Sequence, residues 1–137
     1  MAVLLYRPPD SQAGERLQNA IKTELSGKKT EIYHSIKELA ERLIKRDHNG
    51  FIAVLLADSI FELMELLMME ELLKDIRIIL VLPDRSAETV STGHKLRPRF
   101  LSYADGNFSD VAAVLKKMVQ LSDSGSHNDQ RNTGAIN

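Results

Sequence analysis

The sequence contains no cysteine. This absence excludes a disulfide framework, a thiolate metal site and a cysteine nucleophile, and it suits a reducing compartment, so we expect a cytoplasmic protein. Long hydrophobic runs are missing too, since the longest, Phe51–Ala57, is far shorter than the roughly 20 residues that a membrane-spanning helix needs. The first apolar run follows no charged segment, so it does not predict a signal peptide. We therefore expect no membrane partner.

An excess of charge of one sign is also lacking, because the formal net charge is −1. Nothing then draws the whole molecule toward nucleic acid or acidic lipid. A small basic group at Lys95, Arg97 and Arg99 has no interleaved aromatic residues and no groove-entering motif, which argues against a nucleic-acid partner. The glycines are isolated and none forms a phosphate-binding loop after an apolar run, so we expect no nucleotide or flavin cofactor.

Five short apolar runs, each followed by a stretch with helical spacing, dominate what the sequence does contain. These runs are Val3–Tyr6, Thr30–Tyr33, Phe51–Ala57, Ile76–Leu82 and Phe100–Tyr103. Strands that alternate with helices predict a parallel sheet covered on both faces, which is an α/β, three-layer, doubly wound architecture. Five such units in a chain of this length match the flavodoxin-like fold, which implies the strand order 2-1-3-4-5.

The end of the chain differs in composition from the rest. Residues Ser122–Asn137 are mostly Ser, Asp, Asn, Gly and Gln, with almost nothing apolar. Such a segment cannot offset the entropy lost on ordering by burying apolar surface. We therefore expect one domain over residues 1–121 and a disordered tail over residues 122–137.

Two charged residues follow the first and third apolar runs, where ligands collect in folds of this class. Arg7 could bind an anion together with the free backbone amides at the start of the next helix. It could equally be a surface arginine that pairs with Asp58. Asp58 itself could accept a phosphoryl group or cap the helix that follows it.

Element order and length, Asp58 after the third strand, and the run Phe100–Tyr103 before the last helix carry a resemblance to a known family. Over residues 1–121 the chain resembles the receiver domain of bacterial response regulators. That resemblance implies a phosphoryl group carried on Asp58. It also implies an acidic pair after the first strand that holds Mg²⁺, a Ser or Thr after the fourth strand and a Lys after the fifth.

The positions of these partner residues hold other side chains in this sequence. The acidic pair falls on Tyr6 and Arg7, the hydroxyl position on Leu82 or Pro83, and the lysine position on Tyr103. Phosphoryl transfer needs all of these parts, because the metal and the lysine together neutralise the charge on the transferring group. The resemblance is therefore to a degenerate receiver, or pseudo-receiver, with no metal site, no cofactor and no catalytic residue.

The helix predicted after Asp58 is apolar on two sides. One set of apolar residues is expected to face the sheet: Ile60, Leu63, Met64, Leu67 and Met68. A second set, Leu66, Met69 and Leu73, then points the other way and forms a candidate interface. Either the segment Asp84–Arg99 or the helix's own neighbours cover this second set, or a protein partner does, with a homodimer as its simplest form.

The sequence thus predicts a non-enzymatic signalling or regulatory module that works through contact with a protein partner or with a second copy of itself. Two alternatives remain open. One is an atypical receiver that is phosphorylated on Asp58. The other is a sensor of small anionic ligands that uses Arg7.

Overall fold

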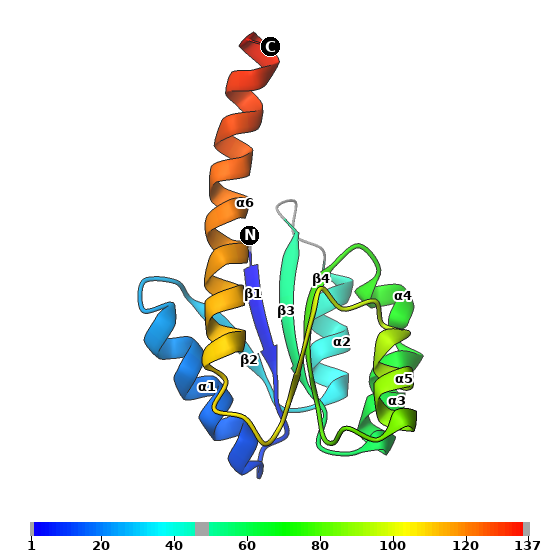
Figure 1. Ribbon diagram of the computed structural model, residues 1–137. Helices are drawn as coiled ribbons and strands as arrows, with labels where there is room; N and C mark the ends of the chain where they lie inside the picture. Colours follow the sequence, from blue (N-terminus) through cyan, green and yellow to red (C-terminus); the bar gives the residue numbers. More distant parts are fainter. Residues whose placement is uncertain (1, 46–49, 136–137) are drawn as a thin grey trace.

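Five parallel strands form one sheet at the centre of the molecule (Figure 1). The computed structural model describes residues 2–45 and 50–135, without the side chains of residues 123–135. The strands lie in the order β2-β1-β3-β4-β5. Their bounds are β1 Ala2–Tyr6, β2 Thr30–Tyr33, β3 Phe51–Leu56, β4 Arg77–Leu82 and β5 Phe100–Tyr103. This arrangement confirms the predicted flavodoxin-like α/β fold and its strand order.

Helices cover both faces of the sheet and complete the three layers. Their bounds are α1 Gln12–Glu24, α2 Ile36–Ile44, α3 Ile60–Met68, α4 Glu70–Leu73, α5 Ala87–His94 and α6 Ser109–Ala135. One buried cluster joins α1 and α6 to one face of the sheet, and a second joins the remaining helices to the other face. All six residues of β3 are buried, as expected for a central strand that is covered on both sides.

Serine side chains begin four of the helices. Ser11, Ser35, Ser59 and Ser86 each have extended backbone, and each accepts a hydrogen bond from the backbone N–H three residues further on. Such caps satisfy an N–H group that has no partner inside the helix, and each contributes about 1 kcal/mol. They fix where each helix leaves the carboxyl end of its strand.

The segment after β3 is two helices, where the sequence predicts a single helix to about Lys74. The break lies at Met69, whose φ and ψ of −105° and 30° interrupt the α-helical conformation. α4 then begins at Glu70, and its Leu73 is buried in the cluster against the sheet. The apolar residues on both sides of the segment allow this, because each of the two helices can bury leucines of its own.

The last helix, α6, is the longest of the described helices and extends well past the ends of the strands (Figure 1). Its first turns are anchored by Val111 and Leu115, which are fully buried. The composition predicts disorder from Ser122, but the backbone continues as helix to Ala135. The helix can continue because extending an anchored helix needs no new nucleus. Residues 136 and 137 lie outside the described chain, and the domain boundary at residue 121 stays a prediction. None of the described helices, α6 included, has the length and apolar character needed to cross a membrane.

Candidate functional site

The candidate site is the crevice at the carboxyl ends of β1 and β3. The chain leaves β1 toward α1 on one face of the sheet and leaves β3 toward α3 on the opposite face. In doubly wound folds, ligands bind where neighbouring strands lead to opposite faces in this way. The Ser11 hydroxyl donates to the Asp58 Oδ1 at 3.2 Å, so the two loops that border the crevice are joined to each other.

Tyr6 and Glu62 occupy the side of the crevice toward α3. The Tyr6 side chain is buried, and its hydroxyl donates to Glu62 Oε2 at 2.8 Å. The other carboxylate oxygen of Glu62 accepts the backbone N–H of Asp58 at 2.8 Å. Burial raises the pKa of Tyr6 well above its ordinary value, and the hydrogen bond and negative charge of Glu62 raise it further. Tyr6 is therefore a neutral donor at neutral pH, and Glu62 ties the end of β1 to the start of α3.

Arg7 points toward α1 and is only 4% exposed. Its guanidinium donates to the backbone oxygens of Pro8 and Pro9 at 3.2 and 3.1 Å. It also donates to Glu15 Oε2 at 3.0 Å and to Gln18 Oε1 at 2.9 Å. The expectation of a surface arginine paired with Asp58 is therefore wrong. The two prolines turn the chain back over the arginine, and their carbonyls take the place of water around it.

Gly14 makes this position for Arg7 possible. A Cβ atom added to Gly14 would lie 2.7 Å from the Arg7 Nε, closer than such atoms approach in proteins. The first turn of α1 therefore needs a residue without a side chain where it passes the guanidinium. With four oxygens already around Arg7, an anion that used this side chain would have to replace some of them, and an anion-binding role stays a prediction.

Asp58 lies just before α3 and does not cap it. Ser59 is the cap, since its backbone is extended and its hydroxyl accepts the Glu62 N–H at 3.2 Å. The expectation that Asp58 caps the helix is therefore wrong by one residue. The Asp58 side chain is exposed and accepts a hydrogen bond from the Ser11 hydroxyl. It remains accessible at the crevice, and its use as a phosphoacceptor stays a prediction.

The groups around Asp58 do not resemble a metal site. Within the described parts of the chain, no group of three or more His, Cys, Asp or Glu side chains is placed to hold a metal ion. Glu62 is the carboxylate that the structure brings toward Asp58, and both of its oxygens already accept hydrogen bonds. Mg²⁺ prefers oxygen ligands, usually carboxylates together with water, and the β1 end offers a buried tyrosine and an arginine instead.

The loops that follow β4 and β5 form a contact that the sequence did not predict. Arg85, in the loop before α5, pairs with Asp105 in the loop after β5 at 2.5 Å, and its guanidinium lies 4.2 Å from the centre of the Tyr103 ring. The Arg85 hydrogen bond lowers the pKa of Asp105. Where the family resemblance implies a lysine, Tyr103 therefore supports an exposed bridge between two loops.

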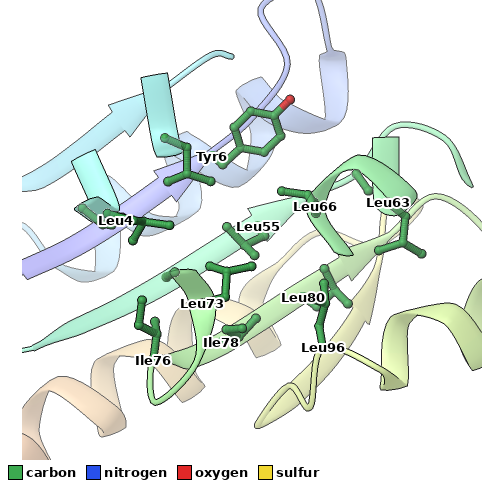
Figure 2. Close-up of a cluster of buried hydrophobic side chains, with 14 of the residues drawn as sticks. Leu4, Tyr6, Leu55, Leu63, Leu66, Leu73, Ile76, Ile78, Leu80 and Leu96 are labelled. Atoms are coloured by element: carbon green, nitrogen blue, oxygen red, sulfur yellow. The ribbon is translucent and has the colours of Figure 1, made fainter. Parts of the chain in front are cut away.

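The three predicted interface residues lie in or against the core. Leu66 is 0% exposed and Leu73 is 3% exposed, and Met69 packs partly buried against the same cluster. Figure 2 shows Leu66 and Leu73 among the side chains of the sheet. The predicted exposure of these residues is wrong, because the helix is rotated relative to the expected direction and breaks at Met69.

A different set of apolar side chains is exposed on α3. Phe61, Met64 and Met68 are 75%, 42% and 86% exposed. The prediction that Met64 and Met68 face the sheet is therefore wrong. The segment at Asp84–Arg99 forms α5, which contacts α3 but leaves all three side chains uncovered. The signal in the sequence was their spacing, since positions 61, 64, 65 and 68 share one face of a helix.

Comparisons of this chain with protein-family models, with curated proteins and with solved structures find no match. The site is therefore interpreted from its own residues and geometry.

Proposed function

We propose that this protein is a non-enzymatic regulatory module that resembles a degenerate receiver domain and acts through contact with another protein. The observation that carries the proposal is the burial of the two side chains at the β1 side of the crevice. At the end of β1, where a receiver holds its metal ion, Tyr6 is buried against Glu62 and Arg7 is buried against α1. Both side chains serve to hold loops together.

The chemistry of phosphoryl transfer explains why this matters. A phosphoryl group moving onto a carboxylate brings its negative charge close to another, and transfer is fast only where cations are placed to offset that charge. The Arg7 guanidinium could offset charge, but its hydrogen bonds go to Pro8, Pro9, Glu15 and Gln18. Within the described residues, Asp58 forms hydrogen bonds with the Ser11 hydroxyl and the Glu62 carboxylate, and neither group is a cation.

A role in protein contact is supported by α3, the helix that follows Asp58. α3 begins at the crevice and presents Phe61, Met64 and Met68 to the solvent. Apolar side chains gathered on one exposed face commonly mark a contact surface, and methionines adapt readily to the shape of a partner. The proposal therefore assigns regulation to the outer surface of α3 and a structural role to the crevice.

The test is to incubate the protein with acetyl phosphate and Mg²⁺ and to measure the intact mass. We expect no stoichiometric gain of a phosphoryl group in the parent, and likewise none in the Asp58→Asn variant. A gain that disappears in Asp58→Asn would overturn the proposal in favour of the atypical receiver.

A second arm addresses the anion sensor. A rise in melting temperature with phosphate or a small dicarboxylate, lost in Arg7→Gln, would favour that function instead. The Lys29→Gln variant is the control, because it removes an exposed cation far from the guanidinium of Arg7.

A further inference from the structure

The outward face of α3 is chemically different from that of an ordinary surface helix. Its four exposed positions are Phe61, Met64, Glu65 and Met68, so three of them are apolar. The inward face already supplies the core contacts, through Leu63 and Leu66, which are fully buried. Phe61 and Met68 therefore add little to the packing of the domain, while they expose apolar surface to water.

The charged residues of α3 and α4 are all negative. Residues 60–73 contain Glu62, Glu65, Glu70 and Glu71 and no Lys, Arg or His. Glu70 and Glu71 line a surface hollow together with Lys74, Lys95 and Arg97, so other parts of the chain already bring cations close to them. Glu65 is exposed among the apolar side chains of α3, and in the described part of the chain it forms no ion pair. An occupant of this face would therefore gain from bringing a cation to Glu65.

A second copy of the chain does not meet this requirement. A two-fold contact through the outer face of α3 would place that face against itself, so Glu65 of one copy would approach Glu65 of the other. Like charges brought together across an interface oppose association. Anionic lipid and nucleic acid are disfavoured for the same reason, because both carry negative charge.

We propose that the outer face of α3, defined by Phe61, Met64, Glu65 and Met68, binds a helical segment of a different protein. That segment has an apolar side bordered by lysine or arginine. The apolar side packs on Phe61 and the two methionines, and a cation at its border pairs with Glu65. This inference rests on the proposed function and names the chemistry of its partner.

The experiment uses two synthetic amphipathic helices with the same leucine face, one with lysines on its polar side and one with glutamates. Binding is measured by fluorescence anisotropy on the full chain. We expect the lysine peptide to bind with a Kd of about 100 μM or tighter, and the glutamate peptide to bind at least about tenfold more weakly. The affinity for the lysine peptide should fall as salt is added.

Variants locate the binding site. Phe61→Lys combined with Met64→Ala should weaken binding of the lysine peptide by about tenfold or more, because it removes two central apolar contacts and adds a repelling cation. Glu65→Lys should weaken it by a smaller factor. Leu121→Ser is the matched control, since Leu121 is also an exposed apolar residue but lies on α6, and its variant should bind as the parent does.

Equal binding of the two peptides, no binding of the lysine peptide at about 100 μM, or equal loss in Leu121→Ser would each overturn the inference. So would a parent protein that dimerises in sedimentation experiments and becomes monomeric in Phe61→Lys, because the occupant would then be a second copy. None of these results requires phosphorylation of Asp58, so failure here is distinct from failure of the proposed function.

Discussion

Helices α2 and α3 cover the same face of the sheet and begin in the same way, yet their outer surfaces differ. Ser35 caps α2 and Ser59 caps α3, and each serine accepts the N–H of a glutamate three residues on. The sequences are SIKELAERLI and SIFELMELLM. The fold can therefore be built with lysine and alanine at the positions where α3 has phenylalanine and methionine.

The paired positions show where the two helices part. Leu39 of α2 and Leu63 of α3 are both fully buried, so the first inward residue agrees. The second does not, because α2 buries Leu43 whereas α3 buries Leu66, at the position of Arg42. On the outside, Lys37 of α2 corresponds to Phe61 of α3. Both helices end in an exposed apolar residue, but only α3 carries a full apolar face. Packing against the sheet therefore does not explain that face.

The largest effect should separate the inner side of α3 from the outer side. Leu66→Ala removes a fully buried side chain, and we expect it to lower the free energy of unfolding by about 2–5 kcal/mol. Met68→Ala, on the exposed side, should change it by less than about 0.5 kcal/mol. Urea denaturation followed by circular dichroism measures both. Similar losses in the two variants would mean that α3 packs in a different orientation.

The next effect concerns the crevice, where Arg7 and Gly14 depend on each other. Gly14→Ala should destabilise the protein by about 1–3 kcal/mol, because its new methyl group meets the guanidinium. In an Arg7→Ala background the clash is gone, and the same substitution should be neutral or stabilising, since alanine is the better helix former by about 1 kcal/mol. A double-mutant cycle of unfolding free energies checks this. Additive effects would contradict the close contact.

A smaller effect is expected from the hydrogen bond between Tyr6 and Glu62. Tyr6→Phe should cost about 1 kcal/mol at pH 7. Because the folded state raises the pKa of Tyr6 above its ordinary 10.0, the folded protein holds this proton more tightly than the unfolded chain does. This contribution is fully present below pH 10 and is lost as the pH rises above that value. The unfolding free energy should therefore fall less steeply above pH 10 in Tyr6→Phe than in the parent. Equal slopes would contradict the burial of the hydroxyl.

The smallest effect on stability should come from giving α3 the outer residues of α2. Phe61→Lys combined with Met64→Ala should shift the unfolding free energy by no more than about 0.5 kcal/mol, because Phe61 is mostly exposed and the higher helix propensity of alanine offsets the loss of the covered part of Met64. Urea denaturation beside the parent gives the value. A loss of several kcal/mol would mean that the outer face belongs to the core, and the comparison with α2 would fail.

Much of the fold could be predicted because its signal is local. The runs at Phe51–Ala57 and Ile76–Leu82 are continuously apolar, as central strands of a parallel sheet must be, and the alternation with helices leaves few topologies. The rotation of α3 could not be predicted in the same way. A helix with apolar residues on two sides has no unique inward direction. As a result, Met68 was expected to face the sheet and Leu66 to face outward, and the structure has the reverse.

The candidate site was predicted only as a location. The sequence places Arg7 and Asp58 at the ends of neighbouring strands, and that is where they lie. It does not show that the carbonyls of Pro8 and Pro9 would surround the guanidinium, because that depends on how the turn folds back. The sequence likewise does not decide between Asp58 and Ser59 as the capping residue of α3, since both residue types are good helix caps.

The most direct test of the whole account is an amide chemical-shift map of the labelled protein, recorded with Mg²⁺ and beryllofluoride and again with the lysine peptide. We expect no change around Asp58 with the first addition and changes confined to α3 and α4 with the second. Large shifts around Asp58 on adding Mg²⁺ and beryllofluoride, with α3 unchanged by the peptide, would contradict it.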